Sequence, residues 1–328
     1  VVLLEGEQTS SFTNCDFVDN HAWEYGIIQH VAGNTTFTDC DFKENGVNES
    51  KYPGVFQLDE GGSGKLTVIG GLCSGNTAGS CGVVNQEATG ALLEMTDVVM
   101  QGNYGKDGHA AFWSAGKATF TRCTFKANTS GSTAKTAGQS ITISNGADVE
   151  MYGCVIQDHA TTSSSTAVSV KGDSKLTMSA DNQGNKNVVS NNSAGYGGAF
   201  ALVANENTSP VVEISDTDFI GNHAKGCGVL RVQGSTDLSL DNCFFKENYS
   251  TEAHSGAIGW ESSGELVCNN CTFEGNYALS KDGNSNGYGG VAALEGDGKM
   301  YINGCHFKGN HAHKQGAVIR TYEPGEMS

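Results

Sequence analysis

The sequence predicts an all-β fold in which about eleven similar coils, each with three short strands, stack as a parallel β-helix. Two observations predict this solenoid. An apolar-x-apolar-x-x-Cys-x-Phe-x-x-Asn pattern recurs along the whole chain, and apolar residues alternate with polar ones inside each copy. Self-similarity at a spacing of about 20 to 50 residues is typical of solenoids. Alternation with a period of two is typical of strands.

Six copies of the pattern are strong, and they close at Asn20, Asn45, Asn128, Asn248, Asn276 and Asn310. Five weaker copies close at Asn76, Asn103, His159, Asn192 and Asn222. The closing positions span 290 residues in ten steps, which gives 290/10 = 29 residues per coil. The steps are uneven, so we expect the coils to share a framework and to differ in their loops.

Each copy is expected to form two strands joined by a bend. In one strong copy the alternating residues form two pairs separated by a two-residue step: Leu238 and Leu240, then Cys243 and Phe245. Because side chains two apart on a strand share a face, we expect such residues to point into the coil. A third strand follows a glycine, in segments such as 54–58, 198–202 and 228–232.

The sequence does not decide which of two adjacent residues of this third strand faces inward. The residues after the glycine are small and apolar: Ile27, Val55, Val83, Ala199, Val229, Ala257, Val291 and Ala317. We expect them to face outward as a flat ribbon suited to lateral packing, because Phe56 and Leu58 look like better core residues. If they face inward instead, they are only core, since a one-residue slip turns every side chain over.

The composition agrees with a β-helix. The 45 glycines can supply the positive φ angles that corners require, and the presence of only 3 prolines leaves strand N–H groups free to pair. No amphipathic helical stripe interrupts the pattern. We therefore expect residues 1–328 to form a single β-helix domain. It starts inside a strand-like segment, so we expect a piece of a larger extracellular protein.

The motifs resemble the FxxN and GGA[ILV] repeats of the chlamydial polymorphic outer membrane proteins. FVDN, FKEN, FKAN, FIGN and FEGN carry the first motif, and YGGAF, SGAI and YGGV carry the second. The resemblance covers nearly the whole chain. It implies a right-handed parallel β-helix of the pectin-lyase-like kind in a surface-exposed, adhesin-like protein. It implies no catalytic residue, because the repeats of that family are scaffold.

The chain is strongly acidic, with a net charge of −17 and a pI near 4.8. Such a surface excludes nucleic acid and anionic membrane as expected partners. No apolar run approaches about 18 residues, so we expect no membrane insertion by this chain. The negative charge favours calcium as the only cofactor. The alternative is that the charge only keeps an extracellular rod soluble.

Seven of the eleven cysteines share one column of the repeat, at 15, 40, 123, 154, 243, 271 and 305. One interpretation is free thiols packed as small apolar residues. The other is a set of disulfides between neighbouring coils, whose Cα atoms would lie near 4.8 Å, within the range that a bridge accepts. The candidates are Cys15 with Cys40, Cys123 with Cys154, Cys243 with Cys271, and Cys73 with Cys81 in a local loop.

Asn-x-Ser/Thr sequons indicate glycosylation if the protein is secreted by a eukaryote. The candidate acceptors are Asn34, Asn48, Asn128 and Asn207. An abundance of Asn, Ser and Thr produces nearly as many sequons by chance. The sequons therefore add support to an extracellular location without establishing it.

The best acidic cluster contains Asp16, Asp39 and Asp41, with Asp16 and Asp41 expected about 5 Å apart on one outer face. Carboxylates this close either share a cation, calcium being the natural one, or repel. Catalysis on polysaccharides would also require a Lys or Arg nearby, and Lys43 is the nearest base. A solvated acidic face accounts for the same residues.

A second column follows the closing asparagine and holds rings in consecutive coils. His223, Tyr249, Tyr277 and His311 are expected to stack there. One interpretation is ring stacking that stabilises a corner. The alternative is an aromatic strip that binds sugar rings.

These observations predict a non-catalytic extracellular rod, either structural or adhesive, which can be a subunit of a cell-surface filament or coat. Its expected partners are other copies, other chains of an extracellular assembly, or glycans. The alternatives are a polysaccharide lyase or glycoside hydrolase of the pectate-lyase-like fold, and a carbohydrate-binding module without turnover.

Overall fold

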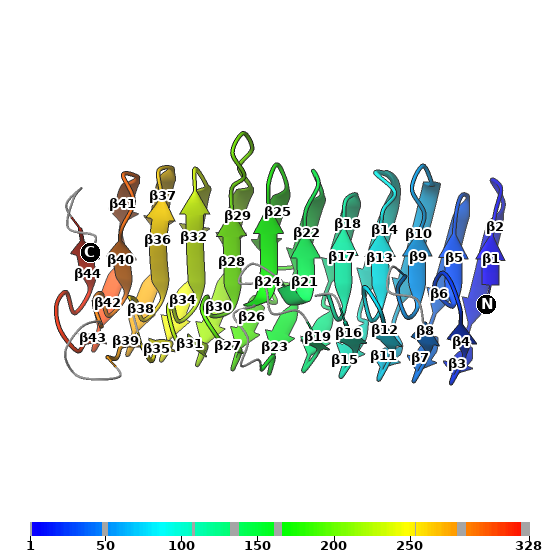
Figure 1. The fold of residues 1–328 in the computed structure, drawn as a ribbon, viewed down its shortest axis with the longest axis horizontal. Coiled ribbons are helices and arrows are strands. Elements are labelled where there is room, and N and C mark those ends of the chain that lie inside the picture. Colours follow the sequence, from blue (N-terminus) through cyan, green and yellow to red (C-terminus); the bar gives the residue numbers. More distant parts are fainter. Residues whose placement is uncertain are drawn as a thin grey trace.

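The computed structural model describes residues 2–47, 52–106, 109–131, 138–160, 166–252, 254–280 and 287–322, and every element among them is a β-strand. The strands form three long parallel sheets that run from one end of a rod to the other (Figure 1). Within the described residues, no helix is long and apolar enough to cross a membrane.

The first sheet holds β1 (Val2–Leu4), β5 (Ile28–His30), β9 (Phe56–Leu58), β13 (Val84–Gln86), β17 (Phe112–Ser114), β21 (Gly138–Ile143), β24 (Thr166–Lys171), β28 (Phe200–Val203), β32 (Leu230–Gly234), β36 (Ile258–Ser262), β40 (Ala292–Leu294) and β44 (Ile319–Thr321). The second sheet holds β2 (Thr9–Thr13), β6 (Asn34–Thr38), β10 (Ser63–Ile69), β14 (Gly90–Thr96), β18 (Lys117–Thr121), β22 (Asp148–Tyr152), β25 (Lys175–Ser179), β29 (Val211–Ser215), β33 (Asp237–Asp241), β37 (Glu265–Asn269) and β41 (Lys299–Asn303).

The third sheet holds β3 (Asp16–Val18), β7 (Asp41–Lys43), β11 (Leu72–Ser74), β15 (Val99–Gln101), β19 (Thr124–Lys126), β23 (Val155–Gln157), β26 (Asn187–Ser190), β30 (Thr217–Ile220), β34 (Phe244–Lys246), β38 (Thr272–Glu274) and β42 (His306–Lys308). Two rows of two-residue strands follow it: β4 (His21–Ala22), β8 (Gly46–Val47), β12 (Thr77–Ala78), β16 (Tyr104–Gly105) and β20 (Thr129–Ser130), then β27 (Ser193–Ala194), β31 (His223–Ala224), β35 (Tyr249–Ser250), β39 (Tyr277–Ala278) and β43 (His311–Ala312).

The predicted stack of coils is confirmed. The eleven described strands of the third sheet match the eleven copies of the sequence pattern one to one. Strands of successive coils pair in parallel and in step, as Phe17 with Phe42 and Phe245 with Phe273 show. Equivalent residues therefore form columns along the rod, with neighbours about 4.8 Å apart.

Aromatic rings fill the coil interior. We call the inward position of the third sheet the phenylalanine column: Phe17, Phe42, Cys73, Met100, Phe125, Ile156, Val189, Phe219, Phe245, Phe273 and Phe307. The rings of Phe219 and Phe245 stack with centroids 4.6 Å apart, and those of Phe245 and Phe273 lie 4.7 Å apart. Apolar burial and parallel stacking thus act together in the same column.

Buried asparagines form a hydrogen-bonded ladder along one corner. The asparagine ladder consists of the residues that close the repeat: Asn20, Asn45, Asn76, Asn103, Asn128, His159, Asn192, Asn222, Asn248, Asn276 and Asn310. At Asn76, the backbone N–H and the side-chain Nδ2 both donate to Asn103 Oδ1, at 3.0 and 2.9 Å. Nδ2 also donates to the Phe42 carbonyl of the preceding coil at 2.9 Å. Asn76 thus connects three coils and satisfies buried backbone groups that would otherwise be unpaired.

The expected outward ribbon of the third-strand segment is wrong. Among its members, Val55, Val229 and Ala257 are fully buried in the core, and only Ala317, in the last coil, is exposed. The chain turns at this corner, so two successive residues, Val55 and Phe56, both contact the core. Simple alternation fails where a corner meets a strand.

The glycine that precedes this segment is required by close approach of backbones. A Cβ on Gly228 would lie 1.9 Å from the carbonyl oxygen of Gly256 in the next coil. No side chain fits there, which explains why the repeat places glycine at this corner.

Candidate functional site

The predicted ring column is present on the surface of the rod. His223, Tyr249, Tyr277 and His311 are register partners in β31, β35, β39 and β43. The rings of His223 and Tyr249 lie 4.7 Å apart at an angle of 3°, and those of Tyr249 and Tyr277 lie 4.8 Å apart at 4°. We call these four residues the aromatic strip.

The stacking decides which part of each ring a ligand can reach. Both faces of the Tyr249 ring are covered, one by His223 and one by Tyr277. Sugar rings bind proteins by packing on an exposed ring face, and neither face of the Tyr249 ring is available for that contact. The geometry therefore favours the structural interpretation of the strip over a platform on which sugars stack.

Replacing Tyr249 with alanine tests this structural role. Two ring stacks are lost, each contributing about 0.5–1.5 kcal/mol, so we expect the unfolding free energy to fall by roughly 2 kcal/mol. Tyr104 is the matched control, because it occupies the same column with Thr77 and Thr129 as register partners. Urea unfolding followed by circular dichroism measures both variants. Equal losses for Tyr249→Ala and Tyr104→Ala would contradict the stacking contribution.

The predicted acidic pair lies where the sequence placed it. Asp16 and Asp41 are direct register partners on the outer face of β3 and β7. Asp41 Oδ2 lies 2.6 Å from Lys43 Nζ, and Asp41 Oδ1 accepts a hydrogen bond of 2.9 Å from the Leu72 N–H. The hydrogen bond to Asp41 raises the pKa of Lys43. Both Asp41 oxygens are therefore engaged by the protein itself.

Asp39 does not complete a metal site with this pair. It occupies the corner before β7, with φ 51°. Among the described residues, no group of three His, Cys, Asp or Glu side chains is placed to hold a metal ion. Calcium binding at Asp16, Asp39 and Asp41 stays a prediction that a titration with the purified chain would test.

The cysteine column also stacks as predicted. Backbone bonds between neighbouring coils align Cys15 with Cys40, Cys123 with Cys154, and Cys243 with Cys271. All eleven cysteines are free thiols in this structure. Cys73 lies in the phenylalanine column beside Phe42, and Cys81 pairs with His109 across a corner bridge, so these two do not close the expected local loop.

Burial makes three thiols outside the column, those of Cys73, Cys81 and Cys227, unreactive. It raises the pKa of Cys81 to about 12 and that of Cys227 to about 12, and it raises the pKa of Cys73 as well. Since the thiolate is the reactive form, such thiols resist oxidation while the coil is folded.

Within the column, burial raises the pKa of Cys40 and Cys123, whereas a hydrogen bond with Cys243 lowers the pKa of Cys271. Packed small apolar residues and inter-coil disulfides therefore both remain predictions for the column.

The sequons differ in accessibility. Asn34 and Asn207 are exposed, and Asn48 lies outside the described residues. Asn128 is fully buried in the asparagine ladder, where its Nδ2 donates to the Met100 carbonyl at 3.0 Å. A glycan on that nitrogen would remove the bond and has no room, so Asn128 is corrected from an acceptor to a structural residue.

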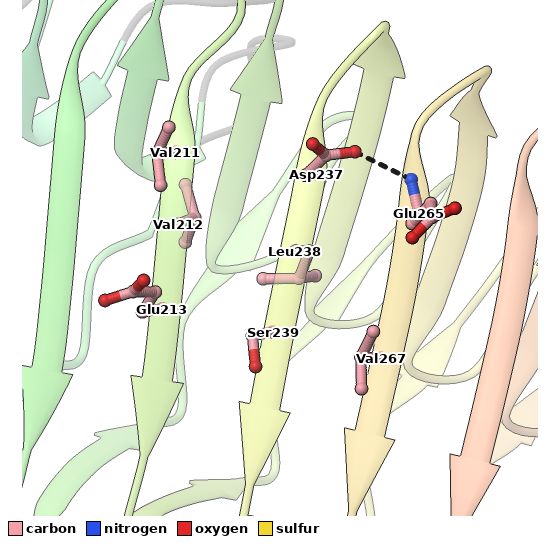
Figure 2. Close-up of a pocket in the computed structure, with 8 residues that line it drawn as sticks. All are labelled: Val211, Val212, Glu213, Asp237, Leu238, Ser239, Glu265 and Val267. Atoms are coloured by element: carbon pink, nitrogen blue, oxygen red, sulfur yellow. Dashed lines mark hydrogen bonds between the residues drawn. The ribbon is translucent and has the colours of Figure 1, made fainter.

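A shallow groove of about 190 Å³ lies on the outer face of the second sheet, over β29, β33 and β37 (Figure 2). Its floor is apolar, and three carboxylates rim it: Glu213, Asp237 and Glu265. Figure 2 shows Asp237 accepting a hydrogen bond from the Glu265 N–H, at 2.8 Å. Lys175 and Lys299 of flanking coils lie 3.9 and 3.4 Å from Glu213 and Glu265, so the protein itself balances both outer carboxylates.

A second depression, of about 370 Å³, contains an ion pair that sequence reasoning missed. The Arg122 guanidinium donates two bonds of 2.8 Å to Asp97, and its Nη1 lies 3.4 Å from Asp181. Hydrogen bonds from Asn185, with smaller contributions from Gln183 and Arg122, lower the pKa of Asp181 to about 2. Asp181 lies 59 residues from Arg122, so no local pattern signals this contact. Asp97 belongs to the coil before that of Arg122, and Asp181 lies two coils after it, so the cluster connects residues of three coils.

Comparison with protein-family models, with curated proteins and with solved structures finds no match for this chain.

Proposed function

We propose that this chain is a non-catalytic structural or adhesive rod of the cell surface or the extracellular space. The observation that supports this proposal is the unbroken in-register stack, in which the recurring Phe and Asn residues of the repeat line interior columns. A solenoid of this kind offers a long, rigid surface on which differing outer residues and loops can meet partners. The Phe-x-x-Asn and Gly-Gly-Ala motifs, which resemble those of chlamydial surface proteins, support the same role.

The acidic surface supports an extracellular partner rather than a nucleic acid. A net charge of −17 repels polyanions and keeps a rod soluble. Other copies of the chain, other chains of an assembly, and glycans are the partner classes that we propose. The exposed sequons at Asn34 and Asn207 can carry glycans without disturbing the coils.

The test combines location and activity. Antibodies against the purified chain are expected to label intact, unpermeabilised cells of the source organism or the matrix around them. Incubation with a panel of acidic and neutral polysaccharides is expected to release no shorter products. Labelling only after permeabilisation would contradict the surface role.

Depolymerisation in that panel would instead support the polysaccharide-active alternative. The groove in Figure 2 would then be its first candidate site, because Glu213 and Glu265 face it from strands two coils apart. Paired carboxylates are what glycoside hydrolysis requires. Glu213→Gln and Glu265→Gln would have to abolish product release, with Glu150→Gln, on the same outer column, as control.

A further inference from the structure

One corner in the middle of the rod departs from the repeat, and a depression lies there. Residues 180–186 separate β25 from β26, whereas only Gly153 and Cys154 separate β22 from β23 in the preceding coil. In solenoids, an insertion into one coil often marks the binding face. The depression of about 370 Å³ beside this insertion is lined by Thr121, Arg122, Tyr152, Ala180, Asp181 and Asn182. A volume of this size is at the lower end for a small-molecule site.

A buried carboxylate holds the inserted segment in one conformation. Asp181 Oδ1 accepts the Gln183 N–H at 2.9 Å and the Asn185 N–H at 2.8 Å. Asp181 Oδ2 accepts a bond of 2.9 Å from Asn185 Nδ2 and lies 3.4 Å from Arg122 Nη1. Because these bonds already order the segment, a ligand that contacts it needs to immobilise little additional chain.

The middle coil of the depression has no side chain at the corner itself. Thr121 and Tyr152 are register partners, so Gly153 occupies in its coil the corner position that Arg122 occupies in the preceding one. Both corner residues have a positive φ, 61° for Gly153 and 51° for Arg122. Arg122 reaches past Gly153 to Asp181, two coils away. The glycine thus leaves the corner beside Tyr152 open.

Tyr152 supplies an aromatic ring to this opening. Its register partners in the neighbouring coils are Thr121 and Ser179, neither of which carries a ring. In the aromatic strip, by contrast, rings of the neighbouring coils cover both faces of Tyr249. The stacking that explains the strip is therefore absent at Tyr152, and its half-buried ring offers an apolar surface to a ligand.

Polar groups with spare hydrogen-bonding capacity surround this ring. The Arg122 guanidinium donates from Nε and Nη2 to Asp97 and from Nη1 to Asp181, which leaves two of its five N–H groups free. The exposed Asn182 amide and the half-buried Thr121 hydroxyl add both donors and acceptors. An aromatic surface with a few placed polar groups is the typical composition of a small-molecule site.

The charge of the depression selects against anions. Arg122 lies between Asp97 and Asp181, so the cluster carries one negative charge in excess. The hydrogen bond to Asp97 raises the pKa of Arg122 and keeps the guanidinium charged. An acidic ligand would meet this excess as well as the net charge of −17 on the chain. An uncharged sugar ring fits better, because it presents an apolar face to the tyrosine and hydroxyl groups that both donate and accept.

We propose that this depression binds one neutral pyranose unit of a glycan. The apolar face of the sugar packs on Tyr152, and its hydroxyl groups bond to Arg122, Thr121 and Asn182. The inference rests on the proposed adhesive role of the rod, for which it specifies the class of partner and the place of contact.

Saturation-transfer-difference NMR of the purified 328-residue chain tests the site. The probes are methyl β-D-glucopyranoside, methyl β-D-galactopyranoside and methyl α-D-mannopyranoside, each titrated alone. We expect at least one to bind with a dissociation constant of about 1 mM, since so small a ligand makes few contacts. The same titration should shift the backbone amide signals of Asn182 and Gly184. D-galacturonate, the anionic probe, is expected to bind at least about tenfold more weakly than the best neutral probe.

Tyr152→Ala is expected to weaken binding of that probe at least about tenfold, because the aromatic contact surface is lost. Tyr152→Phe keeps the ring and should stay within about threefold of the unsubstituted chain. Tyr301→Ala is the matched control: this tyrosine is 44% exposed on the outer face of the same sheet, in β41, and does not line the depression. Circular dichroism verifies that every variant is folded.

Absence of binding by all three neutral probes overturns the proposal. Binding that Tyr152→Ala leaves unchanged also overturns it, because the sugar then binds elsewhere, and so does tighter binding of D-galacturonate. None of these results bears on antibody labelling of intact cells. Failure of the sugar site and failure of the proposed surface role are therefore distinguishable.

Discussion

Replacing Asn248 with alanine is expected to lower the free energy of unfolding by roughly 3–5 kcal/mol, since each buried polar group left unpaired costs about 1–3 kcal/mol. Asn248 is fully buried in the middle of the asparagine ladder. Its Oδ1 accepts the Asn222 N–H at 2.9 Å and Asn222 Nδ2 at 3.1 Å. Its Nδ2 donates to the Phe219 carbonyl at 2.9 Å. Nδ2 also donates to Asn276 Oδ1 at 2.9 Å. Alanine removes all four bonds and takes these partners from groups of both neighbouring coils.

The effect is measured as a shift of the urea midpoint, together with hydrogen exchange of the Asn222 and Asn248 amides. Exchange is needed because a solenoid can open locally before it unfolds as a whole. Asn34→Ala is the matched control, since Asn34 is exposed at the start of β6. If Asn248→Ala costs no more than Asn34→Ala, the ladder does not stabilise the stack.

The repeat made the interior of this fold predictable. Every coil places the same residue types in the same order, so one aligned copy predicts the column of all the others. The alignment of Cys123 with Cys154 and of His223 with Tyr249 followed directly from the spacing. Parallel pairing in the same register then determined which face each of the other strand residues points to.

Other features could not be derived from the spacing. Burial of both Val55 and Phe56 depends on how the chain turns at the corner, which alternation does not encode. The engagement of Asp41 by Lys43 depends on side-chain conformations. Outward residues do not repeat between coils, so the groove over β29 and the contact of Arg122 with Asp181 leave no periodic signal. The proposed function depends on such outward residues, which is why it was less predictable than the fold.

One coil breaks the ladder and should make the rod sensitive to acid. His159 takes the place of an asparagine: its Nδ1 accepts the Asn128 N–H at 3.1 Å, and its own N–H donates to Asn192 Oδ1 at 3.2 Å. Its Nε2 is buried with no hydrogen-bond partner among the described residues. Burial lowers the pKa of His159 from 6.5 to about 4.

The sign of the pH dependence follows from that shift. As the pH falls below about 6.5, His159 of the unfolded chain binds a proton, whereas His159 of the folded chain stays neutral until about pH 4. The stability present above about pH 6.5 is therefore lost progressively down to about pH 4, and this group causes no further loss below that. A shift of this size corresponds to roughly 3 kcal/mol.

His159→Asn should remove this loss and restore the missing bond. The new Nδ2 would face the Phe125 carbonyl, as Asn128 Nδ2 faces that of Met100. We expect a gain of about 1 kcal/mol near neutral pH, because an unpaired buried group is replaced by a bonded one. At about pH 4 the advantage should grow to roughly 4 kcal/mol, the sum of this gain and the lost proton linkage. Burial also lowers the pKa of His30 and His223, so the variant keeps some acid sensitivity. The decisive quantity is the difference between the two urea midpoints at each pH. A constant difference across this range would show that His159 is not the residue that couples the stack to acid.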